Sequence, residues 1–389
     1  MKIKRHILIK AATVSESLDY LLKGQLKYLN KEYDVIALAS GIDSLKVVKE
    51  REGVKVINVR IFRQINLLSD LVSLINVYFI LKNVKPTIVH SITPKAGLLF
   101  MVAAYFAKVP IRIHTFTGLV FPSKTGMLQR LLIFMDRVLC FCGTAIYPEG
   151  QGVKNDLINY KITRKPLKII GNGNGNGIDT SYFSRSALNE SEIQQIRNIW
   201  QIKFEDFVFV FIGRLVKDKG INELVSAFIQ VNQQHPQTKL LLVGGEEKEL
   251  DPLKPETIGT IKNHPNIIST GFQPDVRLFL AVSYVLVFPS YREGFPNVVM
   301  QAGAMGLPCI VTNINGCNEI IEDGNNGVII EPKNEKELED AMSKLIIDTE
   351  LRKTLAENSR KMIVNRFEQK YFWNELLKEY QSLLKAKGI

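Results

Sequence analysis

Three charged side chains stand directly after strand-like apolar runs, where their chemistry could be used on a ligand. Glu293 follows the run Tyr284–Phe288, which has the character of a buried parallel strand. Arg214 follows a second run, Phe207–Gly213, and Lys219 stands at the start of the next helical pattern. Because open α/β sheets bind ligands at the carboxyl ends of their strands, these positions predict a ligand site. A planar arginine and a lysine a few residues apart can neutralise a diphosphate.

The stretch after Glu293 predicts a helix N-terminus at the same place. Pro296 suits the first helical position, and Asn297–Met305 has apolar residues at helical spacing. The unpaired N–H groups and the dipole of such a terminus favour an anion. An ordinary strand–turn–helix unit with solvated surface cations would show similar features. Two such features at corresponding strand ends of one domain favour the binding site.

The same residues suggest chemistry without a metal or a resident cofactor. The chain has no Asp-x-Asp pair suited to holding a divalent cation on a diphosphate, and its acidic residues cluster only at 246–251, where we expect a solvated loop. A leaving diphosphate would then be stabilised by Arg214, Lys219 and the helix N-terminus, and each such donor can lower the barrier by about 3 kcal/mol. The four cysteines lack metal-ligand spacing, which indicates buried thiols in a reducing compartment.

Strand-like and helical segments alternate along the whole chain, which predicts parallel sheets built from βαβ units. We expect two doubly wound, Rossmann-like α/β domains that face a cleft. Residues 1–178 would form the first domain and residues 179–368 the second, joined by the turn-rich Gly/Asn run at 171–177. A C-terminal helix, 369–389, is expected to pack back on the first domain.

Charge is divided unevenly along the chain. Residues 1–175 contain 26 Lys/Arg and 11 Asp/Glu, a net charge of +15, whereas residues 176–389 contain 24 and 28, a net charge of −4. A basic first half indicates an anionic partner, such as a lipid surface or a phosphorylated substrate. Nucleic acid is the least favoured partner, because the lysines are scattered and no nucleic-acid motif is present.

We expect no signal peptide and no membrane span. The apolar stretches 97–107 and 131–141 are too short, or are interrupted by charge. The loop 115–126 places Leu119, Val120, Phe121 and Pro122 beside Lys124, a combination that suits a membrane interface. The competing interpretation is that this loop folds onto its own core.

Three segments together resemble a known family. They are GRLVKDKG from Gly213, SYREGFPNVVMQAGAMGLPCIVT from Ser290 and NEIIEDGNNGVII from Asn318, and in order and spacing they are similar to glycosyltransferase family 4. That family consists of retaining transferases of the GT-B fold. The resemblance is strong over about 205–335, and weaker at HSITPKAGLL and around His114. The subgroup it resembles adds sugars to polyprenyl-diphosphate-linked acceptors for capsule, O-antigen or exopolysaccharide.

The resemblance implies roles for individual residues. Arg214 and Lys219 match the cations that bind the donor diphosphate, and Glu293 matches the first acid of the paired-acid motif, which contacts the donor sugar. The positions expected to bring backbone or side-chain groups to the nucleotide-sugar are Gly213, Gly294, Phe295, Pro296 and Asn297.

Two positions depart from the family pattern or are ambiguous. The second acid of the motif falls on Gln301, whose amide can still donate to and accept from ribose hydroxyls. His114 matches a histidine near the reacting sugar in many relatives, but a buried and satisfied histidine at a strand end is the competing interpretation. The paired glycines expected after the first strand are replaced here by ATVSES, from Ala12.

The sequence therefore predicts a metal-independent, retaining hexosyl- or N-acetylhexosaminyltransferase with a UDP-linked donor. It would act on a polyprenyl-diphosphate-linked saccharide, in the cytoplasm and peripherally on the inner face of an anionic membrane. One alternative is a nucleotide-sugar 2-epimerase of the same fold. Another is a non-catalytic sugar-nucleotide- or lipid-binding partner in a polysaccharide assembly complex. Arg214, Lys219 and Glu293 argue against the non-catalytic alternative.

Overall fold

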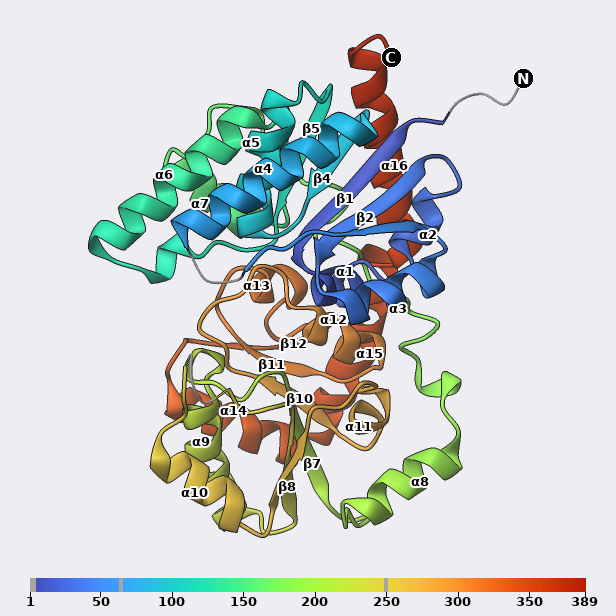
Figure 1. Cartoon of the computed structure of the whole chain (residues 1–389). Coiled ribbons are helices and arrows are strands. Elements are labelled where there is room, and N and C mark those ends of the chain that lie inside the picture. The colour runs from blue at the N-terminus through green and yellow to red at the C-terminus, as the bar shows by residue number, and fades with distance from the viewer. Residues whose placement is uncertain (1–4, 63–65, 248–250) are drawn as a thin grey trace. The chain divides into compact units, whose positions relative to one another are not determined.

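The chain forms two compact units, each organised around one parallel β-sheet (Figure 1). The computed structural model describes residues 5–62, 66–247 and 251–389. Contacts divide the chain into a first unit of residues 1–177 and 369–389 and a second unit of residues 178–368. Within the described residues each sheet has six strands, in the orders β3-β2-β1-β4-β5-β6 and β12-β11-β10-β7-β8-β9. Both orders are the doubly wound arrangement, so the predicted fold class, two Rossmann-like α/β domains, is confirmed.

The sheet of the first unit is covered by helices on both faces. Its strands are β1 (Ile7–Val14), β2 (Asp34–Ser40), β3 (Lys55–Asn58), β4 (Ile88–Ser91), β5 (Ile111–Phe116) and β6 (Ala145–Pro148). One face carries α1 (Ser15–Leu21), α2 (Gln25–Leu29), α3 (Ile42–Glu52) and the C-terminal α16 (Gln369–Ala386). The other carries α4 (Leu67–Val84), α5 (Pro94–Phe106), the short η1 (Phe121–Ser123), α6 (Gly126–Cys142) and α7 (Gln151–Asn159).

The alternation of side chains along β1 explains this two-sided core. Leu8 and Ala12 point to the face with α16, while Ile9 and Ala11 point to the face with α4–α7. Because both faces are covered, the central strands β1, β4 and β5 are largely buried and mostly apolar.

The second unit repeats this plan. Its strands are β7 (Phe207–Ile212), β8 (Thr238–Val243), β9 (Ile267–Gly271), β10 (Val285–Phe288), β11 (Cys309–Thr312) and β12 (Gly327–Ile330). Its helices are η2 (Arg185–Ala187), α8 (Glu190–Ile199), η3 (Lys217–Lys219), α9 (Ile221–Gln234), α10 (Pro255–Asn263), α11 (Arg277–Ala281), α12 (Asn297–Ala304), α13 (Cys317–Ile320), α14 (Glu335–Ile347) and α15 (Thr349–Arg366). One continuous core cluster unites these elements.

Some local predictions were wrong. Residues 17–29 have apolar side chains at the spacing of one continuous helix, but they belong to two helices, α1 and α2, because Gly24 lies between them with a left-handed φ of 82°. A Cβ at Gly24 would lie 2.7 Å from the Trp373 ring, so α16 is what occupies the space beside this break. Pro296 caps α12 rather than occupying its first turn.

The apolar stretches 97–107 and 131–141 are not the longest in the chain, because the helix α4 is longer. Within the described residues α4 is long and apolar enough to do so by length and composition, and only 17% of it is buried. Its 18 residues include just two charges, Asp70 and Lys82, and Asp70 pairs with Lys95 at 2.6 Å. Charge therefore does not interrupt this helix as it interrupts the stretch 131–141.

The loop expected to meet a membrane is partly folded onto its own core. Phe121 is fully buried and packs edge-on against Tyr160, with ring centroids 4.9 Å apart. Val120 is 38% exposed. The inward Phe121 removes the largest apolar side chain from the surface that the sequence had suggested.

Candidate active site

The predicted ligand residues lie at the point where the strand order of the second sheet reverses. β10 pairs in parallel with β7 on one side and with β11 on the other. The segments after β7 and β10, which carry Arg214, Lys219 and Glu293, therefore emerge side by side at one edge of the sheet. This switch point is where doubly wound sheets bind ligands.

Lys219 and Glu293 form an ion pair at this edge. The lysine ammonium donates to Glu293 Oε1, and both side chains are largely buried, with exposed fractions of 19% and 16%. The same carboxylate oxygen accepts a hydrogen bond from the Ser290 hydroxyl at 2.8 Å. The Lys219 ammonium also lies 5.1 Å from the centroid of the Phe288 ring. The segments after β7 and β10 thus meet in one charged cluster.

Hydrogen bonds from backbone and side-chain groups join the segments after β7 and β10. Tyr291 N–H donates to the Asp218 carbonyl at 2.8 Å, and Arg292 Nε donates to the Asp218 carboxylate at 2.9 Å. From β11, the Thr312 hydroxyl donates to the Ser290 carbonyl. Ser290 and Thr312 are fully buried, so the hydrogen bond between them is shielded from water and fixes the backbone that carries Glu293.

Two glycines allow the close approach of these segments. Gly220, with a left-handed φ of 69°, begins α9, and a Cβ there would lie 2.1 Å from the Pro289 carbonyl oxygen. Gly316, with φ of 76°, precedes α13, and a Cβ there would lie 2.2 Å from the Gly294 carbonyl oxygen. Both positions require glycine for conformation and for space.

Arg214 is at the same edge but is not part of the Lys219–Glu293 cluster. It follows Gly213, and its guanidinium pairs with Glu247 while its side chain stays 62% exposed. An exposed pair of this kind is weak in water, so the arginine can be drawn to a stronger anion at small cost.

The loop after Glu293 closes against the core. Gly294, Phe295 and Pro296 are buried, and Phe295 packs against Phe367 with ring centroids 5.5 Å apart. Asn297 and Gln301 lie on α12, and both are half-buried. The buried Phe295 ring fixes the position of the first turn of α12, which starts at this edge of the sheet.

His114 belongs to the first unit and is completely buried on β5. Its Nδ1 lies 2.9 Å from the Ser91 hydroxyl, and its ring meets Phe116 edge-on at 4.6 Å. Burial lowers the pKa of His114 to about 3, so the imidazole is neutral at physiological pH. Its Nε2 is buried without a hydrogen-bond partner among the described residues. The histidine is therefore only partly satisfied, and its role stays a prediction.

Sequence reasoning missed residues that support the cluster. Ser290, Asp218 and Thr312 have no charge pattern that marks them, although Ser290 directly follows Pro289 at the strand end. It also missed a buried polar cluster in the first unit. There the His90 Nδ1 lies 2.6 Å from the Tyr380 hydroxyl and 3.3 Å from the Lys10 ammonium nitrogen.

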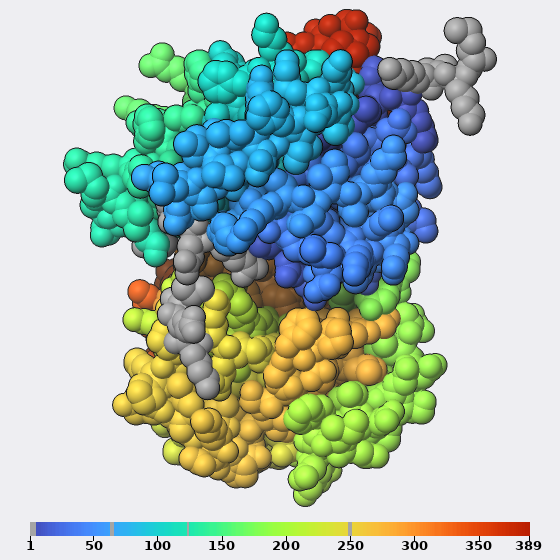
Figure 2. Space-filling model, in the orientation of Figure 1, coloured from blue at the N-terminus to red at the C-terminus, as the bar shows by residue number. Residues whose placement is uncertain are grey.

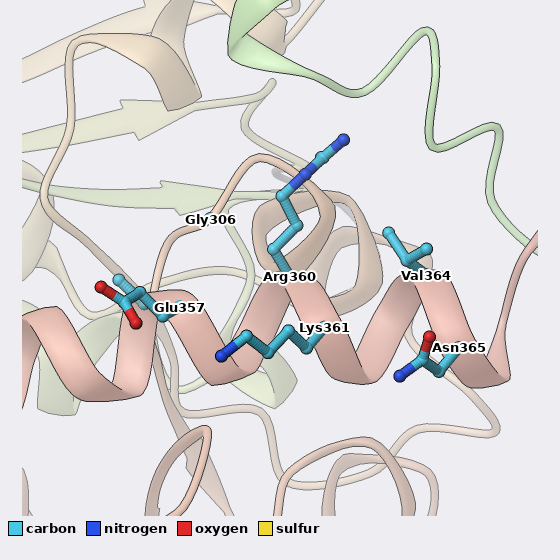
Figure 3. A pocket seen from close by; sticks show the side chains of 7 residues that line it. Gly306, Glu357, Arg360, Lys361, Val364 and Asn365 are labelled. Atoms are coloured by element: carbon cyan, nitrogen blue, oxygen red, sulfur yellow. The ribbon is translucent and has the colours of Figure 1, made fainter.

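A surface pocket of about 580 Å³ lies elsewhere in the second unit (Figure 3). It is lined by Gly306 and residues of α15, including Arg360 and Lys361, and by none of the predicted ligand residues. Arg360 extends away from Lys361 and donates to the carbonyls of Ala304 and Phe183. The guanidinium of Arg360 thus binds the C-terminal end of α12, and so it has a structural role beside this pocket.

Among the described residues, no group of three or more His, Cys, Asp or Glu side chains could hold a metal ion. The four cysteines are buried, and burial raises the pKa of Cys140 to about 12, so its thiol is unreactive.

Comparison with known proteins assigns the family. The Glycosyltransferase Family 4 model matches residues 20–181, and the Glycosyl transferases group 1 model matches residues 192–362. A capsular polysaccharide biosynthesis glycosyltransferase, CapM of Staphylococcus aureus, is 33% identical over 385 residues, which cover 98% of this chain and 99% of that protein. The chain belongs to glycosyltransferase family 4.

A second relative of this family 4 glycosyltransferase is an Escherichia coli enzyme. It is named UDP-Gal:alpha-D-GlcNAc-diphosphoundecaprenol alpha-1,3-galactosyltransferase, and it is 30% identical over 308 residues, 78% of each chain. Among solved structures, Anabaena HepE in complex with UDP and glucose has a TM-score of 0.81 at 19% identity, covering 97% of this chain and all of that chain. This structural likeness supports the GT-B fold.

Proposed function

We propose that this glycosyltransferase moves a hexosyl or N-acetylhexosaminyl group from a UDP-sugar to a polyprenyl-diphosphate-linked saccharide during assembly of a surface polysaccharide. The observation that carries the proposal is the Lys219–Glu293 pair at the switch point of the second sheet, next to the start of α12. A cation and a carboxylate beside the start of α12 support the binding of a nucleotide-sugar at this edge, because its diphosphate is negatively charged and its sugar carries hydroxyls.

The donor role of each residue follows from its surroundings. Lys219 and the exposed Arg214 would neutralise the charge that develops on the leaving diphosphate. Glu293, held by Ser290, would accept hydrogen bonds from hydroxyls of the donor sugar. Gly213, Gly294, Phe295, Pro296 and Asn297 would shape the nucleotide-sugar site, and Gln301 would contact the ribose.

The relatives support the substrate classes. The Escherichia coli enzyme is named for a UDP-Gal donor and an undecaprenol-diphosphate-linked GlcNAc acceptor, and the Staphylococcus aureus protein for capsular polysaccharide biosynthesis. The net positive charge of the first unit, with 30 Lys/Arg and 13 Asp/Glu, suits an anionic lipid-linked acceptor and a cytoplasmic membrane face. We assign acceptor binding to the first unit and His114 to the neighbourhood of the reacting sugar.

The proposed reaction retains the anomeric configuration and needs no metal. Lys219, Arg214 and the α12 N-terminus would supply the stabilisation that a divalent cation supplies in other transferases. The leaving diphosphate would assist the acceptor hydroxyl on the face from which it departs.

A donor screen tests this proposal. The full chain is incubated with a panel of nucleotide-sugars and a short-chain polyprenyl-diphosphate-GlcNAc acceptor, and release of nucleoside diphosphate is measured. We expect release from a UDP-sugar that depends on the acceptor. If no donor in the panel gives acceptor-dependent release, the proposed substrate pair is wrong.

A further inference from the structure

The outer face of α4 is apolar where a helix on the surface of a soluble domain is ordinarily polar. Leu67 and Leu68 are 84% and 80% exposed, and Leu71, Val72 and Phe79 are each more than half exposed. The opposite face of α4 is packed into the domain core. The helix lies on the surface of the first unit, in light blue in Figure 2. Its exposed side chains are mostly apolar.

The neighbouring helices α5 and α6 also expose apolar side chains. α5 contacts both α4 and α6, and the three helices lie side by side over one face of the sheet (Figure 1). On α6, Met127, Leu131, Phe134 and Phe141 recur at helical spacing and are all exposed, Met127 by 84%. At the end of α5, the exposed Tyr105 packs against Phe141 with ring centroids 5.9 Å apart.

Charge around these side chains has one sign. Residues 66–142 contain eight Lys/Arg and two Asp/Glu. The exposed cations are Lys82, Lys85, Lys108, Lys124, Arg130 and Arg137. Of the two acids, Asp70 is paired with Lys95, and burial raises the pKa of Asp136 to about 7. Exposed apolar and aromatic side chains bordered by cations are the composition of a surface that lies in an anionic membrane interface.

We propose that the outer face of α4, α5 and α6, called here the α4–α6 face, is the surface by which this chain lies on an anionic phospholipid membrane. The inference rests on the proposed lipid-linked acceptor and names the surface that would bring the enzyme to it. It replaces the loop 115–126, whose Phe121 is buried, as the principal apolar contact. The apolar side chains enter the interface and the bordering cations meet lipid phosphates, so no part of α4 needs to cross the membrane.

Vesicle co-sedimentation of the full chain tests the proposal. The variant Leu68→Ser/Leu71→Ser/Phe79→Ser changes three exposed side chains of α4, and Met127→Ser/Leu131→Ser/Phe134→Ser changes three on α6. We expect the wild type to bind vesicles that contain phosphatidylglycerol in preference to pure phosphatidylcholine, and each triple variant to bind about tenfold or more weakly. The matched control, Phe204→Ser/Phe272→Ser, removes equally exposed apolar side chains from the second unit and should bind as the wild type does.

Two further measurements distinguish failure of the proposed docking surface from failure of the proposed function. Turnover with a soluble short-chain acceptor should be the same in the triple variants and the wild type, because no substrate residue is changed. If the wild type binds vesicles but turns over no donor, the proposed function fails and the docking surface stands. Wild-type binding by both triple variants would overturn the docking surface. A dimer of the wild type in sedimentation velocity that the variants lose, with no vesicle binding, would also overturn it, because a second copy would then cover the α4–α6 face.

Discussion

The ion pair of Lys219 with Glu293 is the residue-scale feature on which the proposed chemistry depends. Without a donor, the lysine and the carboxylate satisfy one another in a largely buried place. A diphosphate would compete for the lysine and leave Glu293, still bonded to Ser290, to accept from sugar hydroxyls. The ion pair would thus hold both side chains in place until a bound donor engages the lysine and the carboxylate separately.

Replacing either predicted phosphate-binding cation should impair transfer. We expect Lys219→Met and Arg214→Met each to lower kcat/KM for the donor by about 100-fold, because each removes a positive charge that is proposed to stabilise the leaving diphosphate. Steady-state release of nucleoside diphosphate measures this effect. Lys217→Met is the matched control, because it removes an exposed lysine from the same short helix, η3, and should be within a few fold of wild type.

Gln301 should act on donor binding more than on turnover. Gln301→Ala is expected to raise the donor KM, whereas Gln301→Glu, which restores the family's acid, should change it by a few fold at most. A charge-assisted hydrogen bond contributes roughly 1.5–3 kcal/mol against about 1 for a neutral one, but repulsion from the diphosphate offsets the gain. Calorimetric titration with UDP checks this, and equal affinities in wild type and both variants would remove Gln301 from the ribose site.

The buried histidines should make the protein sensitive to acid. The pKa of His114 is lowered to about 3 and that of His90 is lowered well below 6.5, mainly by burial. Below about pH 6.5 the histidines are protonated in the unfolded chain but stay neutral in the folded chain. The free energy of unfolding therefore falls as the pH falls. Each histidine contributes about 1.4 kcal/mol per pH unit in this range. Urea unfolding at pH 4.5, 5.5 and 7.5 should show a shallower slope for His114→Asn than for the wild type.

Lys10, which lies beside His90, gives a second pH dependence at the alkaline end. Burial lowers its pKa to about 7 from an ordinary 10.5, so the folded chain binds fewer protons than the unfolded chain between these values. Stability should therefore rise with pH from about 7 to 10 in the wild type, and Lys10→Met should flatten that rise. An unchanged alkaline slope in Lys10→Met would show that Lys10 stays charged when folded.

At the scale of elements, the turn from η3 into α9 fixes how closely the segments after β7 and β10 approach. Gly220→Ala should destabilise the protein by about 2 kcal/mol or more and raise the donor KM, because the methyl group would meet the Pro289 carbonyl. Gly53→Ala is the control: Gly53 has a similar φ of 67° but nothing within 4 Å of the new Cβ. Equal losses in the two variants by urea unfolding would mean that backbone conformation alone accounts for the effect at Gly220.

The elements also show what the sequence could and could not predict. The runs that became β7 and β10 are apolar because helices cover both sheet faces, so their ends, and hence Arg214, Lys219 and Glu293, could be located from the pattern. Helices α3, α8, α10 and α13 were not predicted. The exposed face of α4 was missed because a helix that is apolar all round gives no sign of which side is buried.

At the scale of the whole molecule, contacts between residues far apart in the sequence could not be predicted. Nothing local indicates that the Tyr380 hydroxyl reaches His90, 290 positions away in the chain, or that Ser290 would orient Glu293. The division into two units was easier to predict from the sequence, because the alternation of strands and helices begins again at Phe207. The resemblance visible in the sequence was strongest in three segments of the second unit, and that unit carries most of the predicted ligand residues.

The most direct test of the account is the product of the complete reaction. The full chain, a UDP-sugar and a short-chain polyprenyl-diphosphate-GlcNAc acceptor are incubated with a metal chelator, and the anomeric configuration of the purified product is determined by NMR. We predict a glycosylated acceptor with the configuration of the donor, formed at an undiminished rate with chelator present. An inverted anomer, loss of activity with the chelator, or conversion of UDP-N-acetylglucosamine to its 2-epimer without any acceptor would contradict the proposed function.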